Sequence, residues 1–300
     1  MNKVAIFGIV LAVGSYAVGY KSRDFVRDKF YLPLISSINQ KKLEASYRQV
    51  LCPKGGIVLA TFGQSNSANS VMPVASDVIP KNLFQYDWKT NKCYEYKEPL
   101  LGTTGNRGNV ITHTASEIAQ KTTKPVVVIP FGVGGTSVLE WAYGYLSYQQ
   151  DIALASIKNS GLTPKVFLWH QGEQDARVSS PNTLKNIPPF VKPQSKDSLF
   201  GLTRKSYADA LQKVVDKTRE YFPESYFGIA LVSRCSRSNQ WEPIREAQQQ
   251  IAKANDKTFI SADSDKIYSE NTRYDKCHFS QEGAKKLGSK YYSSISTMLK

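Results

Sequence analysis

Short apolar runs alternate with amphipathic segments along the chain from residue 55 onward. Five runs are almost entirely apolar and have the length of buried strands, and they cover residues 56–62, 124–131, 165–170, 226–233 and 257–262. Such runs are typical of parallel strands that are buried on both faces. Apolar side chains recur at helical spacing in the segments between and after them, which are 110–120, 147–160, 204–222, 241–256 and 280–299.

This alternation predicts an α/β fold. Five parallel strands with helices on both faces would form a three-layer α/β/α sandwich around a five-stranded, flavodoxin-like sheet. Ligands of such sheets bind beyond the carboxyl ends of the strands, so the loops after the strands are where chemistry is expected. The connection at 177–201 is long and rich in proline, and loops of this length are typical of functional lids or of disordered segments.

The amino-terminal segment is apolar in a different way. Residues 4–20 carry no charge, and as a helix they would span about 25 Å, just short of a roughly 30 Å hydrocarbon core. We therefore expect residues 1–22 to be a hydrophobic helix that acts as a transmembrane signal anchor or a signal peptide, with a buried core helix as the alternative. Residues 23–50 then form a basic stem, and residues 51–300 form the domain that carries the chemistry.

The chain is strongly basic, with 39 Lys and Arg against 25 Asp and Glu and a net charge of +14. Such a charge attracts anionic partners, which include nucleic acid, an anionic membrane surface or an acidic polysaccharide. The sequence has no zinc-finger spacing, Arg-rich arm or RNA-binding aromatic signature, so we expect no nucleic acid. The Lys and Arg residues after the apolar segment favour a cytoplasmic domain, but large domains are exported despite local charge. We expect a membrane-anchored or exported protein with an extracytoplasmic domain.

The four cysteines are Cys52, Cys93, Cys235 and Cys277. None of them forms a C-x-x-C pair, which disfavours a zinc site and thioredoxin-type chemistry. An even number permits two disulfides in an oxidising compartment. From their places along the chain we predict the pairs 52–93 and 235–277, with four free thiols as the alternative.

Polar residues that can act together follow the first and the fifth apolar runs. Ser65 comes directly after the first run, and Asp275 and His278 follow the fifth run three residues apart. A carboxylate at that spacing can orient an imidazole, whose second nitrogen is then able to accept a serine proton. Taken separately, Ser65 could belong to a plain turn and Asp275 could be a solvated residue near a helix cap. Because parallel strands end at one edge of a sheet, we expect the three side chains to meet there.

Three further loops at the same edge carry groups that can bind an anion. Gln171 follows the third run within the sequence WHQGE, and its side-chain amide can donate to an oxyanion. The glycine-rich residues 105–109 precede a predicted helix, whose first N–H groups are free. Residues 134–137 follow the second run and could equally form a plain turn.

Four motifs occur in a characteristic order: GQSN, GGTS with Trp141, WHQGE-x-D and D-x-x-H-F-S-x-x-G. In this order they resemble the SGNH hydrolases, and most closely the carbohydrate acetylesterase branch with its sialate O-acetylesterases and acetylxylan esterases. The resemblance spans about residues 55–298. The sequence has no G-x-S-x-G elbow, which disfavours the usual α/β-hydrolases.

The resemblance implies roles for the residues at these motif positions. Ser65 would be the nucleophile, His278 the base and Asp275 its orienting partner. The backbone N–H groups of Ser65 and Gly108 and the side chain of Gln171 would form the oxyanion hole, although Gly105 could take the place of Gly108. Substrate contact or support of the loops would fall to Gln64, Asn66, Gly135, His170 and Glu173. We expect Glu173 to brace its loop and not to transfer protons.

The activity that this resemblance implies is hydrolysis of O-acetyl esters on a carbohydrate through an acyl-enzyme, with no metal and no cofactor. Two alternatives remain open. The same triad could serve a glycan O-acetyltransferase, or the chain could be an inactive, membrane-tethered glycan-binding module. The expected partners are an O-acetylated carbohydrate and an anionic membrane surface, and the sequence predicts no oligomeric state.

Overall fold

The computed structural model describes residues 43–75, 78–176, 202–235 and 241–299. The predicted amino-terminal helix at 1–22, most of the predicted stem and the connection at 177–201 lie outside these residues. The chain divides into a unit at 1–48 and a larger unit at 49–300, and the larger unit is described below. In the part of the chain that the structure describes, no helix is both long and apolar enough to span a bilayer.

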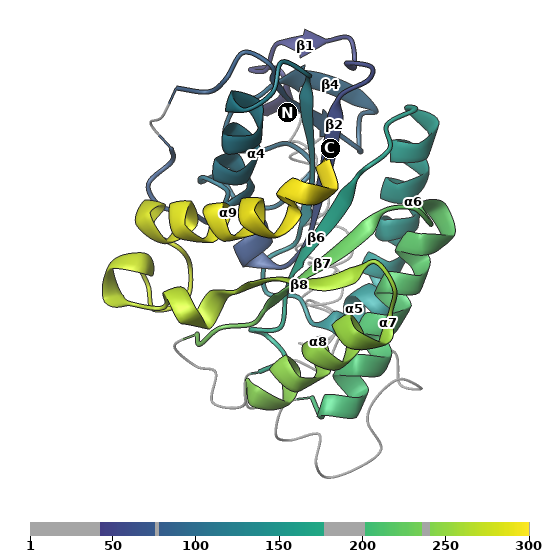
Figure 1. The fold of residues 1–300 in the computed structure, drawn as a ribbon, viewed down its shortest axis with the longest axis vertical. Helices are drawn as coiled ribbons and strands as arrows, with labels where there is room; N and C mark the ends of the chain where they lie inside the picture. The colour runs from purple at the N-terminus through teal and green to yellow at the C-terminus, as the bar shows by residue number, and fades with distance from the viewer. Residues whose placement is uncertain (1–42, 76–77, 177–201, 236–240, 300) are drawn as a thin grey trace, which may run out of the picture. The chain divides into compact units, whose positions relative to one another are not determined.

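The larger unit is built around one sheet of eight strands (Figure 1). The strands are β1 (Gln49–Val50), β2 (Ile57–Gly63), β3 (Leu83–Asp87), β4 (Lys92–Glu95), β5 (Val126–Gly132), β6 (Val166–His170), β7 (Tyr226–Leu231) and β8 (Thr258–Asp263). Their order across the sheet is β1-β4-β3-β5-β2-β6-β7-β8. Strand β4 runs antiparallel to its neighbours β1 and β3, and all other neighbouring strands are parallel.

The five strands expected from the apolar runs are β2, β5, β6, β7 and β8. Numbered by their sequence, they lie in the order 2-1-3-4-5, which is the flavodoxin-like order. The sheet nevertheless has eight strands where five were expected. The hairpin of β3 and β4 was missed because polar Gln85 and Asp87 interrupt the apolar pattern of β3. Gln85 is fully buried, but its amide donates to the carbonyl groups of Glu95 and Lys97, so burial leaves its polar atoms satisfied.

Helices cover both faces of the sheet (Figure 1). One face carries α4 (Ile111–Gln120) and α9 (Gln281–Ile295), and the other carries α5 (Val138–Tyr143), α6 (Tyr145–Asn159), α7 (Arg204–Tyr221) and α8 (Glu242–Ala254). Successive side chains of a strand point to opposite faces. In β2, Ile57 and Leu59 accordingly belong to the core under α4 and α9, whereas Val58, Ala60 and Phe62 belong to the core under the other helices. The result is a three-layer α/β/α arrangement.

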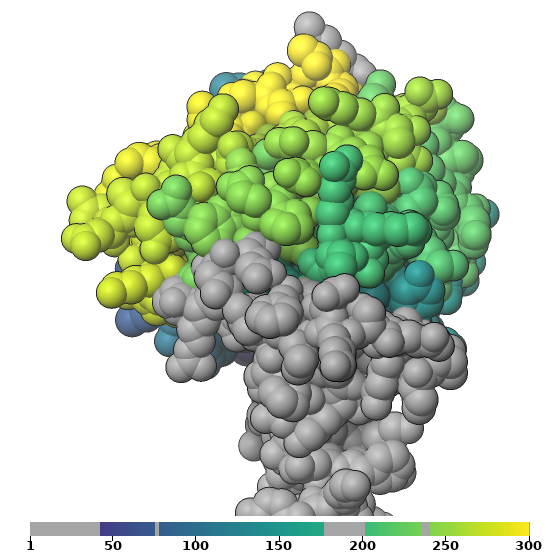
Figure 2. All heavy atoms as spheres, turned by 90° about the horizontal axis from the view of Figure 1, so that it is seen from below, coloured from purple at the N-terminus to yellow at the C-terminus, as the bar shows by residue number. Residues whose placement is uncertain are grey.

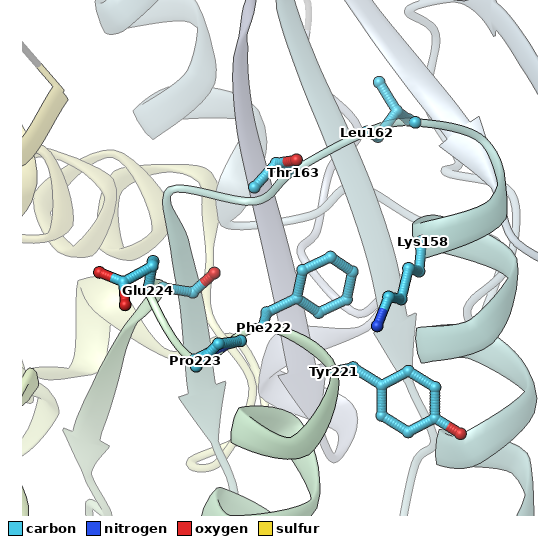
Figure 3. Close-up of a pocket in the computed structure, with 9 residues that line it drawn as sticks. Lys158, Leu162, Thr163, Tyr221, Phe222, Pro223 and Glu224 are labelled. Atoms are coloured by element: carbon cyan, nitrogen blue, oxygen red, sulfur yellow. The ribbon is translucent and has the colours of Figure 1, made fainter.

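The two edges of the parallel sheet differ in chemistry. A cavity of about 230 Å³ lies at the edge where the parallel strands begin, and Figure 3 shows Lys158, Tyr221 and Phe222 lining it. It contains none of the predicted site residues. These residues follow the strand ends at the other edge. That end of the molecule is seen in Figure 2, where the green-to-yellow surface includes α8 and the segment after β8.

Candidate active site

Ser65 lies on a sharp turn at the end of β2. Gly63 has a φ of +132°, and a Cβ there would lie 2.2 Å from the carbonyl oxygen of His170, so only glycine fits. The N–H of Gln64 donates to the same carbonyl group at 3.0 Å. Ser65 then begins the short 3-10 helix η2 (Ser65–Ser67). The close approach of two strand ends therefore presents a half-buried serine at the sheet edge.

The loop that carries Asp275 and His278 closes on itself. A bridge pairs Arg273 with Phe279, and the N–H of Tyr274 donates to the carbonyl group of His278 at 3.1 Å. Inside this loop, one carboxylate oxygen of Asp275, Oδ1, accepts the backbone N–H of His278 at 2.7 Å. The aspartate is thus held by the backbone of the residue that it orients.

The structure brings Ser65, His278 and Asp275 together in one hydrogen-bonded chain. His278 Nδ1 lies 2.7 Å from Asp275 Oδ2, and His278 Nε2 lies 2.9 Å from Ser65 Oγ. An ionised carboxylate only accepts hydrogen bonds, so Nδ1 is the donor and Nε2 is left to accept the serine proton. Partial burial would raise the pKa of Asp275, but the hydrogen bonds from the His278 ring and backbone outweigh it and lower that pKa. The carboxylate therefore stays ionised at neutral pH.

The GQSN and WHQGE motifs interlock through Gln64, which is buried. Its Oε1 accepts hydrogen bonds from the backbone N–H groups of Gly172 at 3.3 Å and Gln174 at 3.2 Å. It also accepts one from Gln171 Nε2 at 3.2 Å. Gln64 therefore fastens the serine turn to the loop after β6.

Asn66 joins the same two loops through a charged residue. Its Nδ2 donates to Glu173 Oε1 at 2.6 Å, and His170 Nε2 lies 3.3 Å from the same oxygen. Burial would raise the pKa of Glu173, but the contacts with His170 and Asn66 outweigh it and lower that pKa to about 2. A carboxyl group with this pKa holds no proton at neutral pH. His170 is itself buried, and its Nδ1 lies 3.0 Å from the hydroxyl of Tyr291.

Arg273 is a site residue that sequence reasoning missed. It is buried, its guanidinium lies 3.4 Å from the centre of the Phe279 ring, and it donates to Ser233 Oγ at 2.8 Å. Burial lowers the pKa of Arg273 to about 10, while the charge of Glu173 acts in the opposite direction. Its position two residues before Asp275 was the available signal, but nothing in the sequence shows that this arginine is buried.

Two expected oxyanion donors are already occupied. The N–H of Gly108 donates to the carbonyl group of Val71 at 2.9 Å. Gln171 is fully buried, and its Nε2 lies 2.9 Å from the Thr136 carbonyl oxygen and 2.6 Å from Asp175 Oδ2. In this structure both groups therefore have acceptors within the protein, and their role as oxyanion donors stays a prediction.

The loop after β5 lies closer to the serine than the sequence indicated. A Cβ on Gly134 would be 3.7 Å from the Cβ of Ser65. The N–H of Gly134 is taken by Thr104 Oγ1 at 2.9 Å. Among the described residues, the N–H groups of Ser65 and Gly135 donate to no acceptor. Both N–H groups are therefore available to a ligand.

The two disulfides pair Cys52 with Cys93 and Cys235 with Cys277, which confirms the predicted pairing. The second disulfide involves the residue next to His278. Over the described ranges, no group of three or more His, Cys, Asp or Glu side chains could hold a metal ion.

Residues 57–191 match the family model described as carbohydrate esterase, sialic acid-specific acetylesterase. The match includes the Ser65 turn and the loop after β6 and ends before Asp275. The match confirms the resemblance drawn from the motifs and supports a carboxylic ester hydrolase. The description of the matched family points to O-acetyl ester hydrolysis on an acetylated carbohydrate.

Solved structures share the fold at low sequence identity. A protein from Arabidopsis thaliana superposes with a TM-score of 0.61 at 17% identity, over 83% of this chain and 100% of its own. A carbohydrate acetylesterase from Xanthomonas citri gives a TM-score of 0.53 at 14% identity, over 81% of this chain and 56% of its own. No curated protein sequence matches the chain.

Proposed function

We propose that this protein removes O-acetyl groups from a carbohydrate by a Ser-His-Asp acyl-enzyme mechanism. The observation that carries the proposal is the continuous contact from Asp275 through His278 to Ser65, with distances of 2.7 and 2.9 Å. The serine and the histidine are 213 residues apart in the sequence. A nucleophile and base within hydrogen-bond reach, with the base oriented by a third group, is the arrangement that acyl transfer needs.

In the first half of the reaction, Ser65 Oγ attacks the acetyl carbonyl carbon while His278 Nε2 takes the serine proton. Asp275 stabilises the imidazolium that forms. The tetrahedral intermediate then collapses, the bond to the sugar oxygen breaks, and His278 returns the proton to that oxygen. The deacetylated sugar leaves, and the acetyl group remains on Ser65.

In the second half, His278 takes a proton from water as the water oxygen attacks the acetyl-enzyme. Acetate leaves, and the proton passes from His278 back to Ser65 Oγ. The negative charge of each tetrahedral intermediate needs donors that are not already bonded. We assign this role to the N–H groups of Ser65 and Gly135, since neither has another acceptor among the described residues.

The test is acetate release by the full chain from a panel of O-acetylated sugars, comparing the wild type with Ser65→Ala. We expect release and labelling by a serine-directed fluorophosphonate in the wild type, and neither in the variant. Ser67→Ala is the matched control, because the Ser67 hydroxyl donates to the Gln64 carbonyl group within the same turn. This control should still be labelled.

Two results would contradict the proposal. Labelling of Ser65 with acetate release only when a sugar acceptor is added, and with the acetyl group found on that acceptor, would indicate a transferase. Binding of glycan with no labelling of Ser65 would indicate an inactive binding module.

We further propose that the catalytic domain works outside the cytoplasm, tethered or exported by its amino-terminal segment. The support comes from the cysteines, since all four are paired in disulfides. Disulfides persist in oxidising compartments and are rare in the cytosol.

A further inference from the structure

Arg107 is exposed and lies near the proposed catalytic residue His278, with the ring of Tyr274 between them. The Tyr274 ring stacks on the His278 ring, with centroids 6.0 Å apart and an interplanar angle of 24°. The guanidinium carbon of Arg107 lies 5.0 Å from the centre of the Tyr274 ring. Arg107 Nη1 also donates to the Tyr274 hydroxyl. Tyr274 therefore holds Arg107 by a hydrogen bond and a cation–π contact.

The backbone of Arg107 is fastened to the segment that follows Ser65. Bridges pair Asn69 with Gly105 and Val71 with Gly108. Gly105 has a φ of +90°, and a Cβ on it would lie 2.2 Å from the Asn69 carbonyl oxygen. The loop therefore packs tightly against the chain only a few residues beyond the nucleophile. Arg107 therefore occupies a defined position, separated from His278 by the Tyr274 ring.

Arg107 has no acidic partner among the residues that the structure describes. Within the described residues, no carboxylate lies within 4.0 Å of it. Other arginines near the strand ends are paired, as Arg234 is with Asp265 at 3.5 Å and Arg245 is with Asp263 at 2.9 Å. A guanidinium has five N–H donors, so the hydrogen bond to Tyr274 leaves the others available. An exposed, positioned and unpaired guanidinium suits a carboxylate ligand.

We propose that Arg107 binds the carboxylate of an acidic, O-acetylated sugar and thereby determines which esters reach Ser65. Tyr274 is the positioning residue for Arg107. The inference rests on the proposed function for the ester that is cleaved, but it adds a contact of its own to the substrate. The ligand feature that Arg107 would recognise is a carboxylated sugar ring. Uronic acids and nonulosonic acids both have it. The net charge of +14 favours the approach of either type of glycan.

The first experiment measures kcat/KM of the full chain for four esters. They are an O-acetylated glucuronide, O-acetylated N-acetylneuraminic acid, a neutral O-acetylated glucoside and 4-nitrophenyl acetate. For Arg107→Gln we expect kcat/KM to fall on the order of 10- to 100-fold on an acidic sugar, as for loss of a hydrogen bond to a charged group. Hydrolysis of the two uncharged esters should stay within about twofold, because they present no carboxylate to Arg107.

Two further variants separate recognition from other effects. Tyr274→Phe should raise KM for the acidic sugar with little change in kcat, whereas a role in placing His278 would lower kcat on every ester. Lys158→Gln is the charge-matched control, since Lys158 lines the cavity at the opposite edge of the sheet. It should leave all four rates unchanged. Equal losses on acidic and neutral esters in Arg107→Gln would overturn the proposal.

A binding measurement keeps this inference separate from the esterase itself. Glucuronic acid, N-acetylneuraminic acid and glucose are titrated calorimetrically into the full-chain Ser65→Ala variant, with and without Arg107→Gln. We expect an acidic sugar to bind more tightly than glucose, and this preference to disappear with Arg107→Gln. If no ester is hydrolysed but the preference is found, the proposed function fails and the carboxylate contact stands. If acidic and neutral sugars bind alike, or Arg107→Gln changes nothing, the carboxylate contact is refuted.

Discussion

The side-chain amide of Gln171 has no hydrogen to spare for a substrate. Three acceptors lie within hydrogen-bond distance of its Nε2, and Tyr207 donates to its Oε1 at 2.9 Å. Its backbone carbonyl group accepts from Gln248 Nε2 at 2.8 Å. At the scale of the residue, Gln171 is therefore a connector between the loops after β2, β5 and β6.

Replacing Gln171 by Ala should accordingly destabilise the protein as well as inactivate it. The change leaves the Asp175 carboxylate and the Tyr207 hydroxyl without this partner, and each buried group left unpaired costs about 1–3 kcal/mol. Urea unfolding and kcat would be measured together, with the exposed Gln249→Ala as control. Normal stability with kcat reduced by on the order of 100-fold would instead support the oxyanion role.

Asp175 predicts a dependence of stability on pH. It is buried, and burial raises its pKa to about 6 from 3.8, although hydrogen bonds from Ser137 and Gln171 oppose the shift. The folded protein therefore holds this proton more tightly than the unfolded chain does. Protonated Asp175 therefore contributes to the free energy of unfolding. This contribution is fully present below pH 3.8 and is lost as the pH rises through about 6.

Asp175→Asn removes this titration, and its amide oxygen can still accept the Val138 N–H. The free energy of unfolding of the variant minus that of the wild type should therefore increase by about 2–3 kcal/mol from pH 4 to pH 8. Urea denaturation at both values measures the difference, with the exposed Asp256→Asn for comparison. A difference that does not change with pH would show that Asp175 is ionised in the folded protein throughout this range.

At the scale of the elements, the loop between β8 and α9 is the most constrained part of the site. The bridge from Arg273 to Phe279 closes it, and the disulfide from Cys277 to Cys235 ties it to the segment after β7. Ser280 then caps α9 by accepting the N–H of Gly283 at 3.2 Å. His278 is thus held on both sides by structure that does not depend on the substrate.

The two disulfides should therefore differ in their effect on catalysis. Changing both Cys235 and Cys277 to Ser should lower kcat/KM about tenfold or more, because small displacements of a reacting group are costly. Changing both Cys52 and Cys93 to Ser removes a disulfide beside β1 and β4 and should leave the rate within about twofold. Loss of either disulfide should lower the free energy of unfolding by about 2–4 kcal/mol.

Acetate release and urea unfolding of the two double variants test this contrast. The Cys52 and Cys93 pair controls for the general loss of a crosslink, since the two loops that the disulfides close are of nearly equal length, at 41 and 42 residues of separation. If both double variants lose activity in proportion to stability, the disulfide at Cys277 has no separate role in placing His278.

At the scale of the whole molecule, the basic charge, the disulfides and the apolar amino-terminal segment all bear on where the enzyme acts. The proposed location predicts that the protein contains no free thiols in the cells that make it. Trapping with N-ethylmaleimide before lysis, followed by mass spectrometry, counts the alkylated cysteines. We expect none, and alkylation at all four positions would place the domain in a reducing compartment.

The five inner strands and the main helices were predictable from the sequence, because apolar periodicity is a local property that reports burial. The β3 and β4 hairpin was not predictable, since the polar groups of Gln85 are satisfied by backbone atoms that the pattern does not reveal. The disulfide pairing was predictable because each pair joins parts of the chain in or after neighbouring strands, β1 with β4 and β7 with β8.

The proposed chemistry could be predicted from the sequence, since the serine and the Asp-x-x-His pair follow strands whose carboxyl ends share one edge of the sheet. Which hydrogen-bond donors are free could not be predicted and became visible in the folded chain. The N–H of Gly108 and the amide of Gln171 are taken by Val71, Thr136 and Asp175. The fold also places Arg107 beside Tyr274 across 167 residues of sequence. Saturation of hydrogen bonds and pairing of charges depend on neighbours distant in the chain, and no local pattern encodes them.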